Sequence, residues 1–208
     1  SQNLPVVEAK QEYTNVLKNA GFDVIHEKFV SMYKECLNEK SKEPILVRYM
    51  QKLREVLDWS PAYIEIHLNK IKRNCAWFNE LLTAVIVTNV KILSSVKVNK
   101  NKKKVQLKMP DCVKFVHQIF INTAKKIYND IQKSKQFKPD NETFMSLMIH
   151  NSIDETIRNQ IPIQNILQNM LEEDSEEEPE PEEEPEDEPE EEPEEEPEEP
   201  EPEPEEPE

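Results

Sequence analysis

The sequence has 208 residues and a net charge of −17, but its charges are divided between two segments of opposite sign. Residues 172–208 contain 24 Glu, 2 Asp and 10 Pro, whereas residues 1–171 hold all 26 Lys and Arg beside the other 17 acids and carry +9. Gly21 is the only glycine, which excludes the standard phosphate-binding loops, dinucleotide-binding turns, nucleophile elbows and EF-hand loops, because each requires glycine at a tight turn.

This division predicts a mainly α-helical, single-domain body over residues 1–171 and a disordered acidic tail over 172–208. A body of this length buries enough apolar surface to fold without disulfides or metals. The tail has almost no apolar surface to bury, its charges repel one another, and its prolines interrupt helical hydrogen bonding. Three roles are compatible with it: a solvating spacer, attachment to a basic partner, or folding back on the basic body.

The cysteines and the apolar segments indicate a protein of a reducing compartment. Cys36, Cys75 and Cys112 are odd in number and far apart, which predicts free structural thiols or, as the alternative, one interchain disulfide. The most apolar run, 75–98, is interrupted by Asn, Glu and Lys, so we expect a core segment and no membrane span. The N-terminal residues lack the pattern of a signal peptide.

The first predicted helices are separated by Gly21. This glycine is expected to end a short helix, and Asp23 to cap a second helix over 23–39. The second helix places apolar side chains at helical spacing, namely Ile25, Phe29, Met32, Tyr33, Cys36 and Leu37.

A third helix is predicted after Pro44, up to the pair Ser60-Pro61, where serine caps the next helix and proline takes its first position. That next helix, or its successor, continues into the apolar run 81–93, which we expect to be the central element of the fold. The helix predicted after Pro44 carries an apolar stripe formed by Leu46, Tyr49, Met50, Leu53, Val56 and Leu57.

Around residues 96–98 and 105–109 the apolar period changes from 3.6 to 2, which predicts a small β-hairpin with a lysine-rich tip that ends at Pro110. A long helix from about Asp111 to Lys135 follows, with an apolar face made of Val113, Val116, Phe120, Ala124, Ile127 and Ile131.

Two more helices are predicted at the end of the body. Asp140 or Asn141 caps the first, which carries Phe144, Leu147, Met148 and Ile153, and Pro162 starts the second, which carries Ile163, Ile166, Leu167 and Met170.

No catalytic, cofactor or metal site is predicted, and we expect a protein that is not an enzyme. The four histidines are widely separated, and neither HExxH nor CxxC occurs. His117 lies about one helical turn beyond Cys112, a spacing that packing explains better than a nucleophile with its base.

The candidate interaction residues are lysines at the hairpin tip and on the 111–135 helix. Three interpretations remain open for them: phosphate contacts of a nucleic acid, docking on an acidic protein surface, or a solvated surface without a ligand. The lysines are Lys100, Lys102, Lys103, Lys104, Lys114, Lys125, Lys126 and Lys133.

Three segments resemble a poorly characterised virion protein family of the nucleocytoplasmic large DNA viruses, including chlorella virus, iridovirus and mimivirus-like groups. They are WFNELLTAVIVTNVKILSSVKV (77–98), VQLKMPDCVKFVHQIFINTAKKIYNDI (105–131) and ETIRNQIPIQNIL (155–167). The matched positions for which the resemblance implies a structural role are Pro110, Phe115, His117, Ala124 and Pro162, and Val116 and Lys125 also match the family pattern. The residues after Tyr128 and the Glu/Pro tail depart from the family pattern.

The resemblance implies a minor capsid protein that contacts major and other minor capsid proteins, located in the virion and, during assembly, in the host cytoplasm. It carries over no catalytic residue. The alternative hypothesis is a nucleic-acid-associated regulatory protein in which the acidic tail competes for the basic body. Partner identity and oligomeric state are left open by the sequence.

Overall fold

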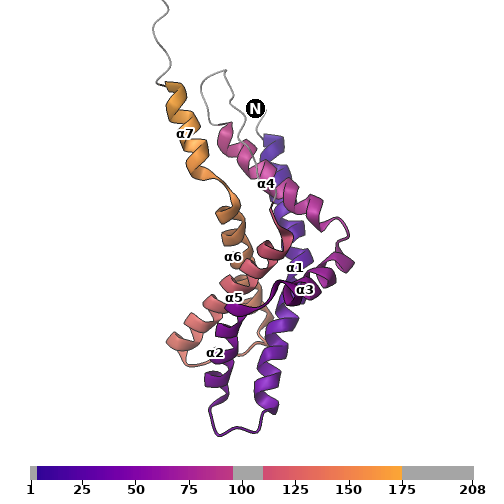
Figure 1. Cartoon of the computed structure of the whole chain (residues 1–208), viewed down its shortest axis with the longest axis vertical. Helices are drawn as coiled ribbons and strands as arrows, with labels where there is room; N and C mark the ends of the chain where they lie inside the picture. Colours follow the sequence, from indigo (N-terminus) through magenta and orange to yellow (C-terminus); the bar gives the residue numbers. More distant parts are fainter. Residues whose placement is uncertain (1–3, 96–109, 175–208) are drawn as a thin grey trace, which may run out of the picture. The chain divides into compact units, whose positions relative to one another are not determined.

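A computed structural model of the chain describes residues 4–95 and 110–174, and within these ranges the fold is mainly α-helical, as predicted. No strand occurs in those ranges. The predicted hairpin falls on residues 96–109 and most of the predicted tail on 175–208, which lie outside the described residues. The elements, shown in Figure 1, are α1 (Leu4–Asn38), α2 (Ile45–Glu55), the short 3-10 helix η1 (Val56–Asp58), α3 (Pro61–Asn74), α4 (Phe78–Ser94), α5 (Cys112–Ser134), α6 (Glu142–Gln160) and α7 (Ile163–Asp174).

Helix α1 runs without a break through Gly21, so the predicted helix end at this glycine and the Asp23 cap are wrong. Gly21 is buried, and a Cβ at this position would lie 3.5 Å from the Ile25 Cδ1 and 4.0 Å from the Ile153 Cδ1 of α6. Apolar contacts on both sides of Gly21 hold the backbone helical, and they outweigh the weak helix propensity of glycine.

Two helices, α1 and α5, form the centre of the fold. Helix α1 packs against α2, α3, α4 and α6, and α5 packs against α2, η1, α3 and α6. Helix α4, which contains the apolar run 81–93, packs mainly along α1 (Figure 1). We expected this run to be the central element, and it is not, because only one face of α4 is fully buried.

The caps predicted for α3 and α6 are confirmed, and Asp111 provides a further cap at the start of α5. The Ser60 Oγ accepts a hydrogen bond from the Tyr63 backbone N–H at 3.2 Å, and Pro61 is the first residue of α3. The Asp111 Oδ1 accepts from the backbone N–H groups at the start of α5, the shortest at 2.9 Å. Asn141, one of the two predicted alternatives, caps α6. These side chains set where each helix begins.

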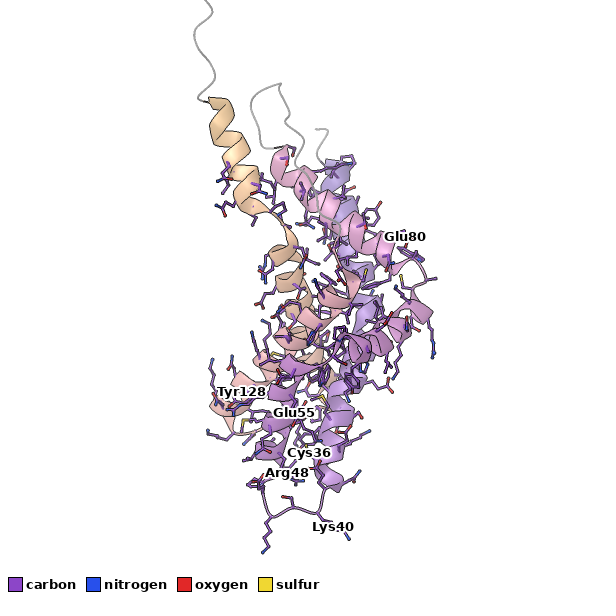
Figure 2. All side chains as sticks on the ribbon, viewed as in Figure 1. Cys36, Lys40, Arg48, Glu55, Glu80 and Tyr128 are labelled. Carbon is purple, nitrogen blue, oxygen red and sulfur yellow. The ribbon has the colours of Figure 1, made fainter. Side chains whose placement is uncertain are left out.

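Arg48 of α2 joins the end of α1 to the start of α2 (Figure 2). Its side chain donates to the backbone oxygens of Cys36 at 2.6 Å, Glu39 at 3.2 Å and Glu43 at 3.2 Å. The last carbonyls of a helix have no intrahelical partner, so this guanidinium satisfies groups that the helix itself leaves open. These hydrogen bonds tie the end of α1 and the connecting residues to α2.

Cys36, Cys75 and Cys112 are free thiols in the structure. Burial raises the pKa of each of these thiols. No helix in the described part of the chain is by itself long and apolar enough to cross a membrane, although α3 and α4 meet the criterion as a pair that is bent by 90°.

A candidate binding groove between α2 and α5

A groove with a volume of about 340 Å³ lies where α2 and η1 pack against α5. Its floor is apolar, and its edge carries the cationic and aromatic groups. The lining residues are Leu53, Arg54, Val56, Leu57, Ile121, Ala124, Lys125, Tyr128 and Asn129.

Both walls follow from helical spacing. Leu53, Val56 and Leu57 come from successive turns on one side of α2 and η1, while Ile121 and Ala124 come from one face of α5. Leu53, Val56 and Ala124 are buried, whereas the Leu57 side chain is 51% exposed. The small side chain of Ala124 leaves room between the walls, so the groove presents apolar surface to solvent at Leu57.

The edge of the groove is basic. The Arg54 guanidinium carbon lies 5.0 Å from the centroid of the Tyr128 ring, and this side chain also hydrogen-bonds the Tyr128 hydroxyl. Gln132 donates to the same hydroxyl at 3.2 Å, and Lys125, which also lines the groove, is exposed. Figure 2 shows Tyr128 on α5 and Glu55, which follows Arg54 on α2. A stacked Arg–Tyr pair keeps its guanidinium and hydroxyl groups in water. The apolar floor of the groove lies beside this pair.

His117 holds the two walls together. Its Nε2 lies 2.8 Å from the Val56 backbone oxygen, and because a carbonyl only accepts, the imidazole carries its proton on Nε2. Phe115, two residues earlier, is fully buried in the core. The hydrogen bond links α5 to η1, which carries the apolar side chains of the opposite wall.

Residues 4–133 match a family of unknown function, DUF5764. This chain belongs to that family. No curated protein and no solved structure matches the chain. The matched residues run from the start of α1 to the last turn of α5, so they include both walls of the groove, while α6 and α7 follow the matched region.

The four lysines predicted on α5 differ in their surroundings. Lys125 lines the groove, whereas Lys126 is partly exposed and forms an ion pair with Glu155 of α6. Lys114 is highly exposed, 4.0 Å from Asp111, and Lys133 is exposed near the end of α5. Lys100, Lys102, Lys103 and Lys104 lie outside the described residues.

Of the other predicted positions, Pro110 and Pro162 lie at the starts of helices, and Cys112 and His117 form hydrogen bonds to different partners. Pro110 is half-buried just before α5, and the Pro162 backbone oxygen accepts from the Ile166 N–H at 3.1 Å in the first turn of α7. Cys112 donates to the Asn79 Oδ1 at 3.1 Å, so the thiol and the imidazole of His117 bond to different partners. Among residues 4–95 and 110–174, no group of three or more His, Cys, Asp or Glu side chains is placed to hold a metal ion.

Sequence reasoning singled out Lys125 but missed two other residues at the edge of the groove. Arg54 and Tyr128 are separated by more than seventy positions in the chain, and neither stands in a recognisable motif. The apolar stripe of α2 indicated Leu53, Val56 and Leu57, but nothing in the sequence indicated that α5 would face them.

Proposed function

We propose that this chain is a non-enzymatic structural component of a large DNA virus particle, a minor capsid protein whose α2–α5 groove binds a segment of another capsid protein. The segment has apolar side chains flanked by Glu or Asp. One observation carries the proposal: an open apolar floor is bordered by Arg54 and Lys125. The resemblance of residues 77–98, 105–131 and 155–167 to virion proteins supports the particle as its location.

The chemistry of the groove favours a protein ligand with acidic residues. Leu57 offers exposed apolar surface that a partner's side chains can remove from water, at a gain of roughly 25 cal/mol per Å². Arg and Tyr are the residue types most often found at the energetic centre of protein interfaces. The basic edge would select acidic flanks and reject basic ones.

The test uses Leu57→Lys, with Leu147→Lys of α6 as the matched control. Leu147 is an exposed leucine of similar accessibility, 58%, and does not line the groove. We expect the wild-type chain and Leu147→Lys in purified particles at the same ratio to the major capsid protein, and Leu57→Lys at a ratio lower by about tenfold, a loss of 1.4 kcal/mol. If the chain is absent from purified particles, or if Leu57→Lys is incorporated normally, the proposal is wrong.

The +9 body supports a second candidate, the nucleic-acid-associated regulator, because exposed lysines neutralise phosphates. The discriminating variant is a full-length chain in which every Glu and Asp of residues 175–208 is replaced by Gln or Asn, here called the neutral-tail variant. A regulator requires this variant to bind duplex DNA with an affinity that falls steeply with salt. Absence of such binding at low ionic strength eliminates the regulator and leaves the capsid proposal.

A further inference from the structure

Helix α7 exposes an apolar face. It follows α6 after only two residues, and it does not pack extensively against another helix in residues 4–95 and 110–174. Its Ile166 side chain is buried and holds the helix to the body. Ile163 and Leu167 are 48% and 51% exposed, and because they are four positions apart they lie on one side of the helix. Helix α7 therefore presents to solvent an apolar face that its own chain leaves uncovered.

The sequence of α7 has the composition that we propose for the ligand of the α2–α5 groove. IQNILQNMLEED begins with apolar residues at helical spacing, contains no Lys or Arg, and ends with Glu172, Glu173 and Asp174. Acidic residues at the C-terminal end of a helix meet the negative end of the helix dipole, which is unfavourable. A cationic surface placed at this end would therefore stabilise the helix.

The α2–α5 groove of the same chain does not receive α7. Helix α6 runs antiparallel to α5, because Glu155 pairs with Lys126 and the next residue, Thr156, accepts from the earlier Asn122 at 3.1 Å. The end of α6 thus lies toward the start of α5, whereas the groove is lined by the later residues 121–129. Figure 1 shows α7 continuing from the end of α6 on the side away from α2. Any α7 that fills this groove belongs to a second copy.

The groove complements α7 in polarity and in charge. Arg54 and Lys125 line it, no Asp or Glu does, and neither cation forms an ion pair with a carboxylate of the described residues. The exposed Leu57 side chain offers apolar surface beside them. Recognition of a helix in a groove commonly uses apolar anchors at positions i and i+4, which is the spacing of Ile163 and Leu167.

We propose that the α2–α5 groove of one copy binds α7 of a second copy of this chain, with Ile163 and Leu167 on the apolar floor and the acidic end of α7 beside Arg54 and Lys125. This inference rests on the proposed function for the chemistry of the groove and names the segment that it binds. The groove and α7 are different surfaces, so a single contact leaves one groove and one α7 free. Reciprocal exchange of α7 closes a dimer, and a one-way arrangement joins copies head to tail.

Sedimentation velocity of the full-length chain tests this contact at about 0.15 M salt. We expect the wild type to associate as its concentration rises from roughly 1 μM to 1 mM, and Leu57→Lys and Leu167→Lys each to weaken association by at least about tenfold. Leu147→Lys of α6, which changes an exposed leucine outside both surfaces, should associate like the wild type. Circular dichroism of each variant establishes that its helices are intact.

An equimolar mixture of Leu57→Lys and Leu167→Lys identifies which surfaces meet. The first variant keeps α7 and the second keeps the groove, so a mixed pair has one intact contact and a pair of either variant alone has none. We expect a 1:1 complex in the mixture only. The proposal is overturned if the wild type is monomeric at about 1 mM, if Leu147→Lys weakens association as much as Leu57→Lys does, or if the mixture associates no more than the separate variants.

The result is separable from that of the particle experiment. A monomeric wild type, together with loss of Leu57→Lys from particles, would refute α7 as the ligand and keep the role of the groove in the particle. Self-association that both Leu57→Lys and Leu167→Lys abolish, in a chain that is absent from purified particles, would keep the contact between α7 and the groove and refute the capsid proposal.

Discussion

Arg48 and His67 are both buried on helices but have opposite relations to their surroundings. Arg48 is 8% exposed and donates to three backbone oxygens, whereas His67 is equally buried and its ring nitrogens have no partner in the described residues. Removal of Arg48 leaves carbonyl oxygens unsatisfied, while removal of the His67 ring nitrogens leaves no partner behind. The two side chains therefore differ in what their replacement does to stability.

Arg48→Met is expected to lower the free energy of unfolding by roughly 2–3 kcal/mol, because methionine fills much of the volume but leaves the Cys36, Glu39 and Glu43 oxygens without their charged donor. Urea denaturation followed by circular dichroism measures the loss. Arg73→Met, at an exposed position of α3, is the matched control and should change stability by less than about 0.5 kcal/mol. Equal stability of the two variants would show that Arg48 is not the tie between α1 and α2.

His67 makes stability depend on pH in a predictable direction. Its folded-state pKa of about 4 lies below the unfolded value of about 6.5, since burial and then Lys28 and Lys70 disfavour the charged ring. As the pH falls below about 6.5 the unfolded chain takes up the proton first, so stability is full above that pH and is lost progressively down to about pH 4. The loss attributable to His67 is on the order of 2–3 kcal/mol.

The measurement compares the wild type with His67→Phe, in buffer without phosphate, by denaturation at pH 7.5 and at pH values between 6.5 and 4. The difference between the two proteins isolates His67, because the carboxylates and His150 titrate in both. Phenylalanine keeps the stacking on Trp59, so we expect the variant to be at least as stable as the wild type at pH 7.5 and to lose less stability as the pH falls. Parallel stability curves would contradict the assignment.

Among the helices, the caps of α3 and α6 were predicted from sequence, whereas the Asp23 cap and the helix end at Gly21 were wrong. The Ser60 and Asn141 side chains accept hydrogen bonds from backbone N–H groups three residues ahead, so local sequence is sufficient to identify these two caps. The state of Gly21 depends on contacts made by the whole of α1, including Ile153 of α6, far along the chain. The groove could likewise be predicted only in part. The apolar faces of α2 and α5 are visible in the sequence, but the packing of these two helices against each other is not.

Gly21→Ala is expected to stabilise the protein by about 0.5–1 kcal/mol, because alanine loses less backbone entropy in a helix interior. The added Cβ would make ordinary contacts with Ile25 and Ile153, at 3.5 and 4.0 Å. Thermal denaturation would show a higher Tm. Gly21→Leu is the steric counterpart and should be destabilising, by roughly 1–3 kcal/mol, since the space holds no longer side chain. A lower Tm for Gly21→Ala would indicate that α1 and α6 cannot accommodate even a methyl group.

The start of α5 offers a second prediction at this scale. Asp111→Ala removes the acceptor of the Val113 and Lys114 N–H groups and should cost about 0.5–2 kcal/mol, measured by urea denaturation. Asp111→Ser restores an acceptor at the same position and should recover most of that loss. Equal destabilisation by alanine and serine would show that the carboxylate acts through its charge and not as a cap.

For the whole molecule, α1 is the element that makes the helical body one cooperative unit. It packs against α4 at one side and against α2, α3 and α6 at others, and Phe29 extends its contacts to α5 through the Phe120 ring, 6.0 Å away. A helix shared by so many neighbours cannot lose its packing in one place without exposing apolar surface in several. Residues 4–95 and 110–174 should therefore unfold in a single transition.

Phe29→Ala tests this cooperativity, because Phe29 is fully buried and its truncation should cost about 3–5 kcal/mol. In a Trp77→Phe background, Trp59 is the only tryptophan, and its fluorescence reports on the cluster that it forms with Tyr63, His67 and Phe120. Circular dichroism reports on all helices together. We expect both signals to have the same urea midpoint before and after Phe29→Ala, with both midpoints lowered equally. If fluorescence is lost before or after the helical signal, then α4 or α6 unfolds separately, and α1 does not couple the two sides of the fold.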